Sequence, residues 1–228
     1  EDEEAEENAG LVIRVGCGQA GGGLMLMDLC VNVESDEPVE TLRASTFEGV
    51  CNANTTAVGR VWVGGEDGGT EAVVCGDEHG ALTLLSVEID DEDELGIELR
   101  FGMGDGERVG HSSGCKVSCI EAVAGGGQQG LGTFVTGGDD DCVRIWMARA
   151  NAEGEHALFA VSVVEGHRNL VTRVVAWWVS ADLADDDAGD PPADAAKRRL
   201  LVMSSSMDRR VRVALVEGWA KAASDGEE

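Results

Sequence analysis

The chain has 228 residues, of which 43% are hydrophobic, and its formal net charge at pH 7 is −27. No apolar run approaches the ~20 residues that span a bilayer, and no stretch has the pattern of a signal peptide, so we expect a soluble protein with its own hydrophobic core. Unaided binding to nucleic acid is disfavoured, because phosphate contacts depend on clustered Lys and Arg.

The acidic residues gather in runs outside the apolar segments, at Glu1–Glu7, Glu88–Glu94, Asp182–Asp190 and Asp225–Glu228. Like charges in such runs repel each other and remain solvated. This pattern predicts a disordered leader over 1–10, acidic surface loops and an acidic tail over 219–228. An acidic docking segment for a basic partner is the functional alternative. Because the sequence begins at Glu1 rather than Met, we expect a piece of a longer protein or a processed chain.

Seven cysteines are scattered along the chain without a CxxC pair. Three of them, Cys17, Cys75 and Cys119, stand in apolar strand patterns, where a thiol behaves as a small hydrophobe. An odd number of scattered thiols is typical of a reducing compartment. We therefore expect an intracellular protein, in the cytoplasm or alternatively in the nucleus.

In chain order, short strand patterns alternate with glycine-rich and aspartate-rich turns, and no segment favours a long helix. Four strand–turn–strand hairpins align with one another and end near residues 29, 87, 148 and 216. Their segments are Val15–Leu29, Val73–Val87, Val135–Ala148 and Met203–Val216. In this alignment the position of Trp146 corresponds to Met27, Leu85 and Ala214. The repeated hairpins predict a fold built from copies of one unit.

Further strand patterns flank the hairpins. Upstream patterns lie at Gly59–Val63, Cys115–Cys119 and Val171–Trp178, and downstream patterns lie at Val39–Ser45, Gly96–Phe101 and Leu158–Val164. The first hairpin lacks an upstream strand. Loops are expected at Asp90–Glu94 and Gly125–Gly130, and a longer insertion over 180–198, where prolines and aspartates cannot continue a strand. We predict an all-β fold of about three and a half four-stranded units over 11–218.

The third unit carries the clearest motif. Gly110-His111 is followed by Thr136 on a strand, by Asp140 in the turn of FVTGGDDDC, and by Val-Arg-Ile-Trp ending at Trp146. This order resembles the WD-repeat β-propeller family. The resemblance implies a buried tetrad of hydrogen-bonded side chains with a structural role, formed by His111, Thr136, Asp140 and Trp146.

The other units match this motif in part. The resemblance implies a partial tetrad of His167, Ser204 and Asp208 in the fourth unit, where Ala214 replaces the tryptophan. In the second unit His79 and Leu85 stand where the aspartate and tryptophan are expected. In the first unit Gly21 and Met27 do so, and Asp28 keeps the aspartate of the Trp-Asp dipeptide. Because propellers protect sheet edges by closing a ring, we expect a partial propeller that belongs to a larger ring of about seven blades or is completed by another segment.

In WD propellers the Gly-His loops share one recognition face with the turns between the second and third strands. The residues that the resemblance places on that face are Ser112, Asp139, Asp141, Arg168, Asn169, Met207, Arg209 and Arg210. Arginine and methionine suit a protein partner, and the alternative is that these are only solvated turn residues. We predict a non-enzymatic scaffold that binds other protein subunits, with no cofactor, no metal, no membrane contact and no direct DNA contact.

A narrower resemblance covers Gly110–Gly218. The order of a His-x-x-Gly segment, the GGDDD turn, a second His with Val171-Thr172, and MSSSMDRRV is similar to the closing blades of the large WD-repeat subunits of tRNA ribose 2′-O-methyltransferases. This resemblance implies an accessory role in tRNA processing. The partner would be a methyltransferase, and tRNA would be reached through it.

Three short motifs point to other chemistry. Gly16–Gly21 matches the GxGxxG loop that cradles pyrophosphate at a helix N-terminus, which keeps a nucleotide-cofactor enzyme as an alternative, although glycine disfavours the helix that must follow. Gly110–Gly114 matches the GxSxG nucleophile elbow around Ser112, which also needs a helix after it. His111, Cys115 and Cys119 lack the spacing of a zinc site. The strand patterns therefore favour the scaffold.

Overall fold

The computed structural model describes residues 11–32, 39–63, 70–89, 95–99, 110–123, 132–150, 156–180 and 198–217. The predicted leader, the predicted tail and the expected loops at 90–94, 125–130 and 181–197 lie outside the described residues. Within the described ranges, no helix is long and apolar enough to cross a membrane.

The described residues form four antiparallel sheets in chain order. Blade 1 contains β1 (Leu11–Gly18), β2 (Leu24–Val31) and β3 (Val39–Phe47). Blade 2 contains β4 (Thr55–Val63), β5 (Thr70–Asp77), β6 (Leu82–Ile89) and β7 (Leu95–Leu99). Blade 3 contains β8 (Val117–Ala122), β9 (Gly132–Gly138), β10 (Val143–Ala150) and β11 (His156–Val164). Blade 4 contains β12 (Val171–Ser180), β13 (Arg198–Ser206) and β14 (Val211–Val216).

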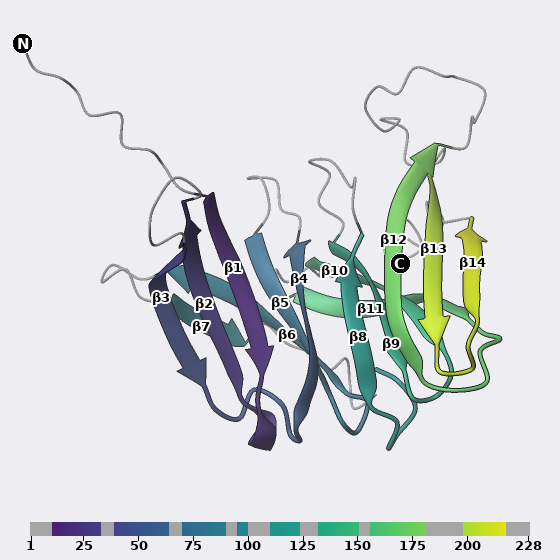
Figure 1. Ribbon diagram of the computed structural model, residues 1–228, viewed down its shortest axis with the longest axis horizontal. Coiled ribbons are helices and arrows are strands. Elements are labelled where there is room, and N and C mark those ends of the chain that lie inside the picture. The colour runs from purple at the N-terminus through teal and green to yellow at the C-terminus, as the bar shows by residue number, and fades with distance from the viewer. Residues whose placement is uncertain are drawn as a thin grey trace, which may run out of the picture.

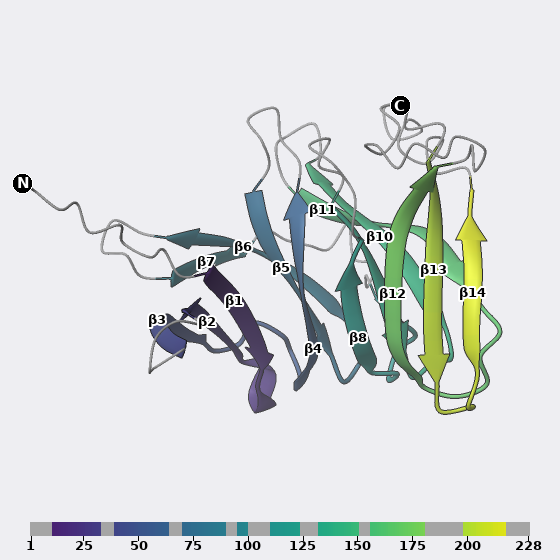
Figure 2. The same cartoon turned by 45° about the horizontal axis from the view of Figure 1, so that its top comes forward.

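The blades stand side by side, from β1–β3 at the left of Figure 1 to β12–β14 at the right. Figure 2 shows that successive sheets lie at an angle to one another and not in one continuous layer. The chain is therefore an all-β partial propeller, as predicted. The first unit indeed has no described strand on the inner side of β1, because the sheet order there is β1-β2-β3.

The four hairpins pair their strands in equivalent registers. Trp146 pairs with Phe134, Leu85 with Val73, Met27 with Val15, and Ala214 with Val202. Each of these pairs is the fourth from the turn of its hairpin. The alignment predicted from sequence is therefore the alignment of the strands in space.

The core lies between neighbouring blades. Alternating side chains of each strand pack against the blade on either side, which is the packing that a period of two produces. Three clusters of buried residues result: Leu24 and Leu26 against Val73 and Leu85, Val61 and Leu84 against Phe134 and Trp146, and Ile145 and Met147 against Val174 and Val202. The one exception among the predicted core cysteines is Cys17, which is exposed on β1.

Glycines on the second strand of blades 2 and 3 let the next blade approach closely. A Cβ atom at Gly76 would lie 2.5 Å from the Cβ of Val117, and one at Gly137 would lie 2.5 Å from the Cγ1 of Val171. Val117 and Val171 are the first residues of β8 and β12. The equivalent position in blade 4, by register, is Ser205.

We expect Gly137→Ala to lower the free energy of unfolding by roughly 1–3 kcal/mol, because the added methyl group would force β9 and β12 apart. Ser205→Ala at the equivalent position of blade 4 should change it by less than ~0.5 kcal/mol. Urea denaturation of the two variants measures both values. Equal small losses would mean that the blades are not held at this close approach.

Hydroxyl groups on the inner strands, β4 and β8, also connect neighbouring blades. Each belongs to the second residue of its strand. The hydroxyl of Thr56 lies 2.6 Å from the carbonyl oxygen of Val117 and 3.2 Å from that of Gly76. Ser118 repeats this contact with the carbonyls of Gly137 and Val171. Sequence reasoning missed these hydroxyls, whose only signal is a Ser or Thr recurring one residue into each inner strand.

Candidate functional site

Four side chains of blade 3 form one chain of hydrogen bonds. In the loop before β8, His111 places Nδ1 2.7 Å from Asp140 Oδ1 and Nε2 2.8 Å from Thr136 Oγ1. The indole Nε1 of Trp146 donates to the same Thr136 oxygen at 2.8 Å. Thr136 is fully buried, and His111 and Trp146 are nearly so. The structure thus brings together all four residues of the predicted tetrad.

The partners determine the protonation of His111. Because an indole nitrogen can only donate, Thr136 Oγ1 accepts from Trp146 and has its own proton to give to His111 Nε2. The other ring nitrogen, Nδ1, then carries the proton and donates it to Asp140. A neutral imidazole satisfies every polar atom, and burial lowers the pKa of His111 in agreement with this assignment.

Asp140 joins the Gly-His loop to the turn that follows β9. Its carboxylate accepts hydrogen bonds from the backbone amide of Ser112 at 3.0 Å, from Arg144 at 2.9 Å and from the Cys142 amide at 3.4 Å. Burial alone would raise the pKa of Asp140, but the hydrogen bonds from the Ser112 amide, Arg144 and His111 outweigh it and hold that pKa well below its ordinary value. One buried carboxylate therefore positions two surface loops.

Blade 4 repeats this arrangement without the tryptophan. His167 places Nε2 2.8 Å from Ser204 Oγ and Nδ1 3.3 Å from Asp208 Oδ2. The Asp208 carboxylate also accepts from the backbone amides of Arg168 at 3.0 Å and Arg210 at 2.9 Å. Burial would raise the pKa of Asp208, and these bonds lower it below its ordinary value. The structure thus brings the predicted partial tetrad together.

In blade 2 a different aspartate orders the turn. His79 occupies the position of Asp140, and the buried Asp77 accepts from the amides of His79 at 2.9 Å and Ala81 at 2.8 Å. Sequence reasoning missed Asp77. The available signal was an aspartate at the end of a strand, where a carboxylate can accept from amides of the following turn.

In blade 1, Asp28 is the centre of a buried ion-pair network. Arg14 donates to both oxygens of Asp28 at 2.7 Å and reaches Glu71 of blade 2 at 2.8 Å, while Arg43 approaches Asp28 at 3.3 Å. The hydrogen bond from Arg14 is the main reason that the pKa of Asp28 lies below its ordinary value. The sequence identified Asp28 only as a motif residue and not its partners.

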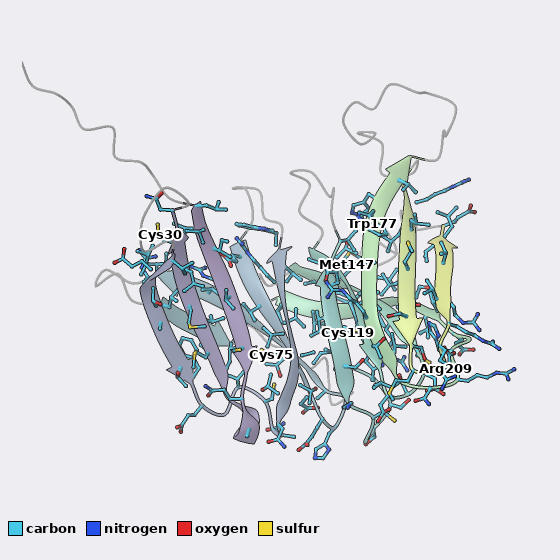
Figure 3. All side chains as sticks on the ribbon, in the orientation of Figure 1. Cys30, Cys75, Cys119, Met147, Trp177 and Arg209 are labelled. Carbon is cyan, nitrogen blue, oxygen red and sulfur yellow. The ribbon has the colours of Figure 1, made fainter. Side chains whose placement is uncertain are left out.

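The loops that carry the predicted face lie at one end of the molecule, which is the lower side of Figure 1. Figure 3 shows Arg209 projecting away from the β13–β14 hairpin at that end. Asp141 is half-buried, and the other residues predicted for the face are exposed: Ser112, Asp139, Arg168, Asn169, Met207, Arg209 and Arg210. The tetrads therefore hold the loops from inside, and these side chains face solvent.

Stability should fall on the acid side of neutrality because of His111. Its folded pKa is lowered, so its contribution is complete above the unfolded value of about 6.5 and is lost as the pH falls below it. The lowered pKa of Asp140 adds a second loss below about pH 4 by the same sign. Urea denaturation from pH 8 to pH 5 should show a shallower slope for His111→Gln than for the exposed-site variant His79→Gln. Identical slopes would contradict a neutral buried His111.

The segments of the alternative motifs lie in antiparallel strands and turns. Gly16 and Gly18 are in β1, and the short 3-10 turn Ala20–Gly22 leads into β2 rather than into a helix. The GxSxG segment is followed by β8, which begins at Val117 and so leaves Cys115 outside the strand predicted for it. Both ring nitrogens of His111 are used within the tetrad, and all seven cysteines are free thiols.

A scan against protein-family models found no match, and a search of curated protein sequences found none either.

Proposed function

We propose that this chain is part of a WD-repeat β-propeller that acts as a non-enzymatic scaffold for protein–protein interaction. The observation that carries the proposal is that Asp140 and Asp208 each join two loops by accepting hydrogen bonds from backbone amides. Each carboxylate and its histidine bond to each other and to neighbouring groups, so we assign them a role in ordering the loops and not in catalysis. The side chains left at the surface form a rigid face, which lowers the entropy lost on binding.

The two end blades support membership in a larger ring. On blade 4, Val211 and Val213 are 66% and 62% exposed, and on blade 1 Leu11 is 66% exposed. These side chains lie on faces that no described blade covers. Thr172 repeats the hydroxyl position of Thr56 and Ser118. Within the described ranges its hydroxyl bonds only to Ser205 of its own blade, at 3.1 Å to the carbonyl and 2.9 Å to the hydroxyl. Further blades would cover these faces in the way that neighbouring blades already cover each other.

Affinity capture with a blocked face tests the scaffold role. Ser112→Trp places a large side chain on the exposed loop before β8, and Thr41→Trp places the same side chain on exposed β3 away from the face. We expect proteins captured from a cell lysate by the unmodified chain to be lost with Ser112→Trp and retained with Thr41→Trp, as quantified by mass spectrometry. Partners that tolerate both substitutions would show that binding lies elsewhere.

An accessory role in tRNA modification is the second candidate. It is supported by the equivalent placement of His111 and His167, because the motifs that follow Gly110 then lie in two adjacent blades. The same capture experiment should then yield an RNA methyltransferase, with tRNA that is released when the methyltransferase is removed. tRNA that remains bound to the isolated chain would contradict contact through a partner.

A further inference from the structure

The described residues of blade 4 carry a net positive charge, although the chain as a whole is strongly acidic. Over residues 165–180 and 198–217 there are seven arginines and three acidic residues, whereas the whole chain has a net charge of −27. The acidic residues are Glu165, Asp208 and Glu217, and Asp208 is occupied inside the partial tetrad. At the loop end of this blade the charged residues are Arg168, Arg209, Arg210 and Arg212 against Glu165 and Asp208, so this end is locally basic.

One carboxylate fixes the spacing of three arginines. Asp208 binds the backbone amides of Arg168 and Arg210, so the two segments that carry these side chains are held together. Arg209 lies between Asp208 and Arg210 in the turn and has φ 64°, in the left-handed region that Gly, Asn and Asp favour. All three side chains are exposed, and in the described part of the chain no salt bridge involves their guanidinium groups.

Blade 3 builds the same backbone arrangement without arginine. Asp140 binds the amides of Ser112 and Cys142, and Asp141 between them has φ 62°. The residues equivalent to Arg168, Arg209 and Arg210 are thus Ser112, Asp141 and Cys142. Because the fold accepts neutral and acidic side chains at these positions, packing does not explain the three arginines of blade 4.

We propose that Arg168, Arg209 and Arg210 bind a carboxylate-rich segment of a protein partner. Guanidinium groups recognise carboxylates through paired, charge-assisted hydrogen bonds. Met207, which is 60% exposed in the same turn, offers an adaptable apolar contact to a neighbouring side chain of that segment. A long nucleic acid is disfavoured by the acidic remainder of the chain. The inference rests on the proposed function and specifies the chemistry of the partner.

Fluorescence anisotropy with a short labelled peptide tests the site. The probe is rich in glutamate around one leucine, and its control replaces every glutamate with glutamine. We expect the combined variant R168Q/R209Q/R210Q to bind the glutamate peptide at least about tenfold more weakly, because charged partners are removed while the backbone amides that bind Asp208 remain. R173Q, at an exposed arginine on β12, is the matched control and should bind as the unmodified chain does.

Transfer of the site to blade 3 provides the converse test. S112R/D141R/C142R places arginines on the equivalent backbone positions, and it should add a second binding site for the peptide that weakens with salt. The inference is overturned if the combined variant of blade 4 keeps full affinity, if the glutamine peptide binds equally well, or if a single-stranded RNA of matched charge binds more tightly. Loss of captured proteins with Ser112→Trp would still support the scaffold in each of these cases, so the two proposals fail separately.

Discussion

Phe134→Ala should lower the free energy of unfolding by about 3–5 kcal/mol, the largest loss that we expect from one substitution. Phe134 is fully buried between blades 2 and 3, and its ring stacks on Trp146 with ring centroids 6.4 Å apart. Removal of the ring leaves a cavity at the centre of that interface and takes away the surface that orients the indole. Urea or guanidinium denaturation followed by far-UV circular dichroism measures the loss.

Two controls separate the cavity from general sensitivity of the strands. Phe134→Leu fills most of the space and should cost less than about 1.5 kcal/mol. Leu42→Ala removes an apolar side chain that is 46% exposed on β3, and it should cost less than ~0.5 kcal/mol. A loss for Phe134→Ala no larger than that for Leu42→Ala would contradict the packing of blade 3 against blade 2.

Asp140→Ala should cost about 3 kcal/mol, because three hydrogen-bond donors lose a charged acceptor at once. Those donors are His111 Nδ1, the amide of Ser112 and the guanidinium of Arg144. The same substitution should loosen the loop before β8, since the carboxylate is the link between that loop and the following turn. Chemical denaturation measures the first effect, and amide hydrogen exchange of Ser112 measures the second.

The neighbouring carboxylate is the control for Asp140. Asp139 is exposed, and its backbone amide donates to the Lys116 carbonyl at 3.0 Å. Asp139→Ala keeps that bond and should change stability by less than ~0.5 kcal/mol. If the two alanine variants melt alike, the buried network around Asp140 does not stabilise the blade.

Local patterns were sufficient to predict the strands and their alignment. Alternation in Val143–Met147 and turn residues in Gly138–Asp141 identify a hairpin without tertiary information. The same pattern recurs with Leu85, Met27 and Ala214 in place of Trp146, and the pairing registers agree with it. His111 and Asp140 came from the motif rather than from periodicity, and their hydrogen bond joins residues far apart in the chain.

Contacts between blades could not be predicted from one sequence. Arg14 and Glu71 belong to different blades, and nothing in either segment identifies the other as its partner. The hydroxyl of Thr56 contacts the carbonyl of Val117 in the next blade. A Thr in a strand is too common to predict such a contact by itself. The exposure of Cys17 has the same origin, because an apolar strand pattern does not reveal which of its faces another sheet covers.

Hydrogen exchange at the Trp146 indole tests most directly whether a buried hydrogen-bond chain connects the loop face to the core of the blade. Trp146 donates to Thr136, which in turn contacts His111, while Trp62 is 53% exposed and serves as the internal reference. We predict that the Trp146 indole proton exchanges only on unfolding of the blade, and much more slowly than that of Trp62. Exchange at the same rate as Trp62 would show that the chain of hydrogen bonds is not formed.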